Sequence, residues 1–114
     1  MINESIIISP LSINKAFQGR RFKTKECKVY ENCLWNLLPK HTMICGKIAV
    51  RYKFYLKNCA RADYDNLIKV TQDIIVKKGW IEDDRKIYRA IIEKYPTKKD
   101  ERIEVELKEI DLTD

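Results

Sequence analysis

The stretch Gly46–Trp80, GKIAVRYKFYLKNCARADYDNLIKVTQDIIVKKGW, decides the fold because it changes from one hydrophobic period to another. Its first part alternates apolar residues with mostly basic ones, which predicts a strand with one buried face formed by Ile48, Val50, Tyr52, Phe54 and Leu56. From Asn66 to Lys78 the apolar residues recur every three or four positions, which predicts an amphipathic helix that ends at Gly79. A strand followed by a helix indicates a sheet covered by helices.

Shorter patterns before this stretch predict one strand, one loop and one helix. Ser5–Ser9 (SIIIS) is typical of a buried strand stopped by Pro10, and residues 11–23 form a basic loop without an acid. Thr24 is a good N-cap for a helix that ends before Pro39. Its apolar positions at helical spacing are Val29, Cys33, Leu34, Leu37 and Leu38.

Two further strands are expected after the second helix, at Ile87–Tyr95 and Ile103–Leu107, joined as a hairpin by a turn over Pro96–Asp100. The expected order is therefore β-α-β-α-β-β. This order predicts an α/β (α+β) fold, with a mixed sheet and two helices in a single domain over residues 1–114.

Charge is sorted along the chain. The 114 residues have a formal net charge of +6, and the basic excess lies in residues 1–62, whereas residues 63–114 have more acids than bases. A basic surface favours a polyanionic partner. The longest apolar run is far shorter than the ~20 residues of a membrane span, and no signal peptide is recognisable, so we expect a cytoplasmic protein without membrane contact.

Cysteine and histidine chemistry is disfavoured as the basis of function. The four cysteines (Cys27, Cys33, Cys45 and Cys59) include no C-x-x-C pair, and His41 is the only histidine. This pattern argues against a zinc site and against most Ser-His or Cys-His nucleophiles. Reduced, partly buried thiols are expected instead.

The densest polar cluster surrounds the start of the second helix. Asp63 and Asp65 are two residues apart at a loop-to-helix junction, where both carboxylates are able to converge on one cation. The alternative is that Asp65 only caps the helix, which explains one carboxylate but not two. Lys69 and Asp73 follow Asp65 at steps of four residues and lie on the same helix face. Lys69 is close enough to reach a phosphate held there. Asp73 is expected to orient Lys69, and the alternative is that Asp73 only faces solvent.

A second acidic cluster, Glu82-Asp83-Asp84, follows that helix. A helix of about 13 residues spans ~20 Å, so it places the two clusters at opposite ends unless the chain turns back. Helix geometry alone therefore argues mildly against one shared site.

Arg61–Asp84, RADYDNLIKVTQDIIVKKGWIEDD, closely resembles the core of the RusA-type Holliday junction resolvases. Their motif runs D-x-D-N-L-x-K-x-x-x-D, followed at a fixed spacing by G-x-x-x-D-D, and both the residues and the gaps match. Pro10–Asn14 resembles the family's P-x-S-x-N segment, and Arg20–Tyr30 resembles its basic loop and first helix. The chain departs at Cys59–Ala62, where some relatives have more arginines, which bears on DNA affinity more than on chemistry.

The resemblance implies roles for individual residues. Asp63, Asp65 and Asp84 match the metal-binding carboxylates, and Lys69 matches the catalytic lysine. The resemblance thus brings Asp84 to the first cluster, against the helix-length argument. Positions of less certain role are Asn66 and Asp73, which we expect to support the site. DNA contacts are expected from Asn14, Lys15, Arg20, Arg21, Lys23 and Arg61, with Lys25, Lys28, Lys53 and Lys57 as further candidates.

The resemblance further implies a homodimer that cuts branched DNA. Three clustered carboxylates repel one another, and Mg²⁺, with Mn²⁺ as its substitute, is the natural compensation. The expected activity is hydrolysis of phosphodiester bonds at four-way junctions in DNA recombination and repair. Two alternatives stay open: a non-catalytic accessory protein that binds branched DNA, and a nuclease of the same chemistry that acts on flaps or forks.

Overall fold

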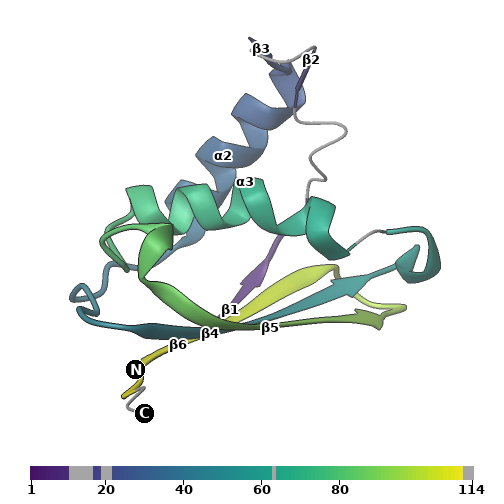
Figure 1. Cartoon of the computed structure of the whole chain (residues 1–114). Helices are drawn as coiled ribbons and strands as arrows, with labels where there is room; N and C mark the ends of the chain where they lie inside the picture. The colour runs from purple at the N-terminus through teal and green to yellow at the C-terminus, as the bar shows by residue number, and fades with distance from the viewer. Residues whose placement is uncertain (11–16, 19–21, 63, 112–114) are drawn as a thin grey trace.

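A four-stranded mixed sheet carries both long helices on one face (Figure 1). The computed structural model describes residues 1–10, 17–18, 22–62 and 64–111, and it does not describe the side chains of residues 17, 18, 22, 23, 61 and 64–66. The elements are β1 (Ile2–Ile7), β2 (Phe17–Gln18), β3 (Phe22–Lys23), α2 (Lys25–Leu37), β4 (Ile48–Leu56), η1 (Cys59–Arg61), α3 (Tyr64–Lys77), η2 (Asp84–Lys86), β5 (Ile87–Pro96) and β6 (Arg102–Glu109).

The strand order of the sheet is β1-β6-β4-β5. β4 and β5 are parallel and are connected through α3, whereas β6 pairs antiparallel with both β1 and β4. The mixed sheet and the predicted element order are confirmed. Residues 11–23, expected to be a loop, contain the short antiparallel pair β2–β3 within their described part.

The predicted hairpin between the last two strands is wrong, because β5 and β6 lie on opposite sides of β4. Their connection crosses the carboxyl end of β4. The amide of Thr97 donates to the carbonyl of Leu56 over 3.0 Å, and the amide of Lys57 donates to the Glu101 carboxylate over 2.9 Å. A turn of hairpin length therefore joins two strands that are not neighbours.

The core lies between the sheet and the two helices. The alternation predicted for β4 is confirmed, since Ile48, Val50, Tyr52, Phe54 and Leu56 are all buried. Trp80 is fully buried, and its ring N–H donates to the carbonyl of Pro39 over 2.9 Å. The side chains of Phe17 and Phe22 lie outside the described part. None of the four cysteines is in a disulfide bond.

Helix α2 begins as predicted but presents a different face to the core. The Thr24 side chain accepts a hydrogen bond from the amide of Cys27, which confirms the N-cap. The buried residues of the helix are Cys27, Tyr30 and Leu34, and the C-cap Leu38 is also buried. Val29 and Leu37 are 56% and 51% exposed, and Cys33 is also exposed. Apolar residues occupy two stripes of this helix, and only one of them faces the core.

Two leucines on this helix provide a matched test of that orientation. Leu34→Ala is expected to lower the free energy of unfolding by about 2–5 kcal/mol, because it leaves a cavity in the core. Leu37→Ala, the control, is expected to change it by less than about 0.5 kcal/mol. Urea unfolding followed by circular dichroism measures both. Equal losses of unfolding free energy in the two variants would contradict the observed helix orientation.

Within the part of the chain that the structure describes, no helix is long and apolar enough to cross a membrane.

Candidate active site

Two of the predicted site residues on α3, Lys69 and Asp73, lie near Asp84 of η2. Lys69 is exposed and Asp73 is half-buried. Asp65 and Asn66 lie in the first turn of the helix, but their side chains are not described, and Asp63 falls outside the described residues. Spacing of four residues keeps Asp65, Lys69 and Asp73 in one row along the helix.

The chain turns back after α3 and brings Asp84 alongside the helix. Gly79 adopts a left-handed φ of +83°, which a residue with a side chain rarely adopts. Ile81 then forms a parallel bridge with Ile44, and η2 returns to contact α3. The charges of Asp73 and Lys69 both act on the Asp84 carboxyl group. The chain therefore turns back after the helix, which is the exception that the helix-length argument allowed, and Asp84 lies near Lys69 and Asp73.

Adjacent acids at the start of η2 have different surroundings. Asp83 is the N-cap of this turn, and its carboxylate accepts hydrogen bonds from the amide of Arg85 (3.2 Å) and from Arg85 Nε (3.1 Å). A hydrogen bond shared with Asp84 lowers the pKa of Asp83, and the Arg85 amide lowers it further. That hydrogen bond raises the pKa of Asp84, as do partial desolvation and the charges of Asp83 and Asp73, whereas Lys69 opposes the rise. Of these two acids, Asp84 is therefore the one whose ionised form a nearby cation would stabilise more.

This asymmetry predicts how the two acids titrate in metal-free protein. Asp84 should lose its proton at a higher pH than Asp83, and Asp83→Asn should lower the pKa of Asp84 because it removes an ionised neighbour. Asp73→Asn should lower it by a smaller amount. Carboxyl-carbon NMR during a pH titration reports each group separately. An Asp84 midpoint below that of Asp83 would contradict the arrangement.

Lys94, which was not among the predicted site residues, lies beside the segment that precedes α3. Lys94 Nζ donates to the carbonyl of Cys59 over 2.7 Å and to that of Ala62 over 2.6 Å. These carbonyls belong to η1 and to the residue just before Asp63. Lys94 pairs in register with buried Phe54 of β4, so it occupies a strand position on the helix-covered face. A charged residue at such a position is the signal that could have identified it.

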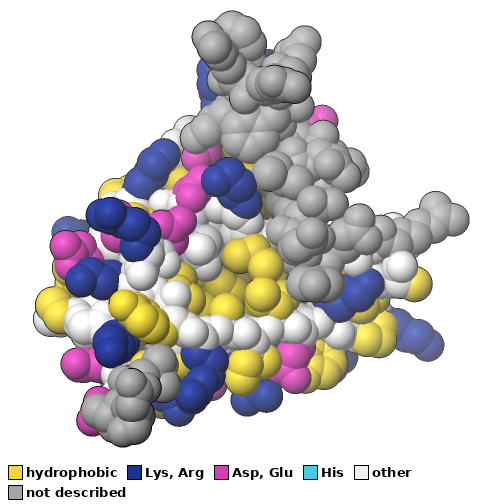
Figure 2. Space-filling view, viewed as in Figure 1, with side chains coloured by type: hydrophobic (Ala, Val, Ile, Leu, Met, Phe, Trp, Pro, Cys, Tyr) yellow, Lys and Arg dark blue, Asp and Glu magenta, His cyan; other side chains and the backbone are white. Residues whose placement is uncertain are grey.

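Acidic and basic side chains gather on the face that contains α3, beside a hollow floored by hydrophobic side chains (Figure 2). Among the described residues, no three His, Cys, Asp or Glu side chains form a metal-binding group. The predicted ligands Asp63 and Asp65 are not among these residues, because Asp63 and the side chain of Asp65 lie outside the described part. The structure therefore brings Asp84 to Lys69 and Asp73, and leaves its approach to Asp63 and Asp65 as a prediction.

Most of the predicted DNA contacts lie outside the described part of the chain. Asn14, Lys15, Arg20 and Arg21 are not described, and Lys23 and Arg61 are placed by their backbone only, in β3 and η1. Lys25 and Lys28 are exposed on α2.

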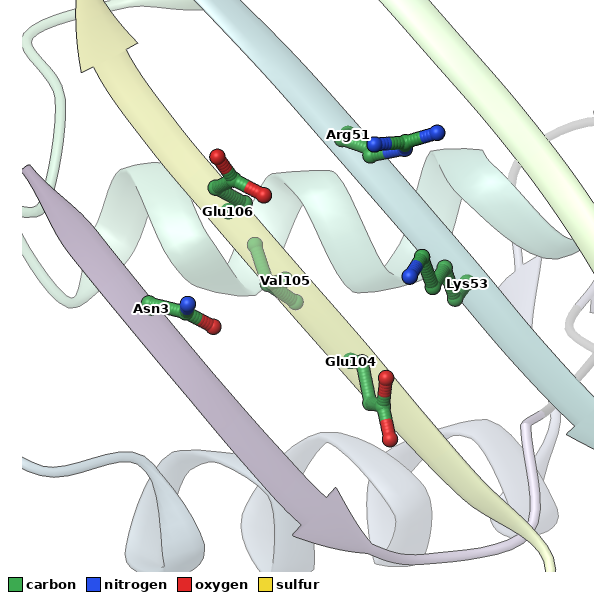
Figure 3. Close-up of a pocket in the computed structure, with 6 residues that line it drawn as sticks. All are labelled: Asn3, Arg51, Lys53, Glu104, Val105 and Glu106. Atoms are coloured by element: carbon green, nitrogen blue, oxygen red, sulfur yellow. The ribbon is translucent and has the colours of Figure 1, made fainter.

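The uncovered face of the sheet has mixed rather than basic charge. Figure 3 shows Arg51 and Lys53 of β4 on the same face as the carboxylates of β6, while Val105 points to the other side. Arg51 lies opposite Glu106 and Lys53 lies opposite Glu104 in the strand register, and Arg51 also binds Glu93 over 3.0 Å. The hollow between them, of about 130 Å³, is smaller than the ~300 Å³ of a typical ligand pocket. This neutralisation makes the α3 face the better candidate for DNA.

The described part of the chain is thus an α+β domain in which Asp84 approaches Lys69 and Asp73 beside α3. The family model Endodeoxyribonuclease RusA matches residues 12–108, and the chain therefore belongs to the RusA endodeoxyribonuclease family. Membership makes a DNA-cleaving hydrolase the established class of activity. A search of curated proteins finds no match to this chain.

Proposed function

We propose that this protein is a Mg²⁺-dependent endonuclease that resolves Holliday junctions in DNA recombination and repair. The observation that carries the proposal is the return of Asp84 to the side of α3, where it is exposed to the charges of Lys69 and Asp73. This return brings the Asp84 end of the family motif to the helix that carries Lys69 and Asp73. The raised pKa of Asp84 supports a cation there, because a positive charge would relieve its repulsion from neighbouring carboxylates.

Carboxylate oxygens are the ligands that Mg²⁺ prefers, and Asp63, Asp65 and Asp84 would hold it. When bound, the metal would polarise the phosphodiester and activate the attacking water. Lys69 is the catalytic lysine of the proposal: its ammonium group stabilises negative charge that develops on the phosphate in the transition state. Asp73, one turn further along α3, orients Lys69 through their opposite charges. Asn66 supports the first turn of the same helix.

Binding of branched DNA is assigned to the basic N-terminal half of the chain. Neutralisation of phosphates by lysine and arginine produces salt-sensitive, sequence-tolerant affinity. The residues proposed for it are Asn14, Lys15, Arg20, Arg21, Lys23 and Arg61. We propose a homodimer, because two symmetric basic surfaces match the near-twofold form of a four-way junction. A cytoplasmic location is part of the same proposal.

Cleavage of a labelled four-way junction tests the function. In Mg²⁺ the purified protein should introduce paired symmetric nicks, and EDTA should abolish cleavage while junction binding persists. Mn²⁺ should restore activity after EDTA is removed. Binding without cleavage in either metal would favour the accessory protein.

A panel of flaps, forks and linear duplexes at fixed salt separates resolution of junctions from general branch cleavage. The four-way junction should be cut fastest. Equal cleavage of linear duplex would contradict structure selectivity.

A further inference from the structure

Lys94 ties the segment that precedes the first acidic pair to the sheet. Its Nζ lies 2.7 Å from the Cys59 carbonyl oxygen and 2.6 Å from that of Ala62. The Ala62 amide itself donates to the Cys59 carbonyl over 3.3 Å, which closes the η1 turn. The ammonium group therefore holds both ends of a closed turn. Hydrogen bonds from an ionised donor are shorter and stronger than neutral ones, so this anchor is a firm one.

The turn that Lys94 holds lies directly before the first acidic pair. Residues 57–62 connect the carboxyl end of β4 to the start of α3, and Ala62 is followed directly by Asp63. The direction in which the chain leaves Ala62 sets where the backbone of Asp63 and the first turn of α3 begin. Because Lys94 belongs to β5, it fixes that direction relative to the strand that follows Asp84 and η2.

A lysine at position 94 carries two electrostatic costs that a packing residue would not. Its neighbour in the register is buried Phe54, and an apolar side chain at this position would fill the same space without desolvation of a charge. A cation near the N-terminus of a helix also opposes the helix dipole. Negatively charged groups near the ammonium offset both costs. Asp63 and Asp65 follow Ala62 in the sequence and supply such groups.

We propose that Lys94 is a positioning residue that holds the Cys59–Ala62 turn so that Asp63 and Asp65 are presented together to a divalent cation. This inference rests on the proposed function, because it assigns these two acids to the metal. Lys94 itself contacts neither metal nor DNA in the proposal. It acts through the backbone carbonyls of the turn.

The test compares Lys94→Met, which keeps the length of the side chain but removes its donors, with Lys94→Arg and with Lys108→Met. Lys108 is an exposed lysine of β6 and serves as the matched control. Mn²⁺ affinity is measured by electron paramagnetic resonance on DNA-free protein. Lys94→Met should weaken Mn²⁺ binding by about 10- to 100-fold, the loss typical when a group that orients metal ligands is removed. Lys94→Arg should recover part of it, and Lys108→Met should match the unaltered protein.

Two further measurements separate the possible failures. Hydrogen exchange of the Ala62 amide should accelerate in Lys94→Met while the amides of α2 stay protected, which shows a local change in a folded protein. Unchanged Mn²⁺ affinity in Lys94→Met would overturn the inference even if the unaltered protein cuts junctions. Conversely, if Lys94→Met weakened Mn²⁺ binding but the unaltered protein cut no junction, the role of Lys94 would be upheld and the proposed junction resolution would be overturned. Absence of Mn²⁺ binding by the unaltered protein would overturn both.

Discussion

Junction cleavage by the Asp84→Asn variant is expected to fall by about 10³-fold or more, while its affinity for the junction in EDTA stays close to that of the unaltered protein. The substitution keeps the size and polarity of the side chain but removes the negative charge proposed to hold Mg²⁺. Its structural cost is small, because Asp84 is exposed and its charge is repelled by Asp83 and Asp73. Single-turnover cleavage at saturating protein measures the chemical step directly.

Asp83→Asn is the matched control for this experiment. Asp83 precedes Asp84 in the chain, but its carboxylate is occupied by the amide and Nε of Arg85. Asparagine is also a good capping residue, so the turn should persist. Cleavage by Asp83→Asn should remain close to that of the unaltered protein. If the two variants lost activity equally, the structural distinction between these acids would be wrong.

Loss of the Lys69 ammonium group is expected to slow cleavage by about 10²- to 10³-fold, the effect typical of removing one group that stabilises transition-state charge. In Lys69→Met the stem of the side chain remains and the positive charge is lost. Junction binding should change little, because Lys69 is proposed to act on the scissile phosphate in the transition state. Rapid-quench measurement of the cleavage rate, together with a binding titration in EDTA, separates the two effects.

Lys77→Met provides the comparison on the same helix. Lys77 lies two turns beyond Lys69, is exposed, and approaches Glu31 of α2 at 3.8 Å. Its removal should leave the cleavage rate unchanged. Rapid cleavage by Lys69→Met would remove the catalytic role assigned to this lysine.

Local pattern was sufficient for the elements of this fold but not for their pairing. The alternation of β4 and the Thr24 cap of α2 depend on neighbouring residues, and both were predicted correctly. The pairing of β6 with β1 and β4 depends on residues more than 40 positions apart, which no local period encodes. The two apolar stripes of α2 show the same limit, because only the packed structure decides which one faces the core.

The candidate site was likewise predicted only where local sequence spacing was sufficient. Spacing of four residues placed Lys69 and Asp73 on one face of α3, and the motif supplied Asp84. Helix length argued mildly against a site shared by Asp84 and the first acidic cluster unless the chain turned back, and it does turn back at Gly79. Lys94 was missed because its two carbonyl partners come from a turn more than 30 residues earlier. Parallel pairing of β5 with β4 is what brings that turn and Lys94 together.

The central position of β6 has a consequence for protein synthesis. A ribosome that has completed residues 1–101 has made β1, β4 and β5 but not the strand that lies between β1 and β4. Long-range strand pairs of this kind form late and fold more slowly than local helical contacts. The sheet that supports α3 and η2 is therefore complete only after Arg102–Glu109 has left the ribosome. An interrupted translation product would lack an assembled site, so a partly made chain is not expected to cut DNA.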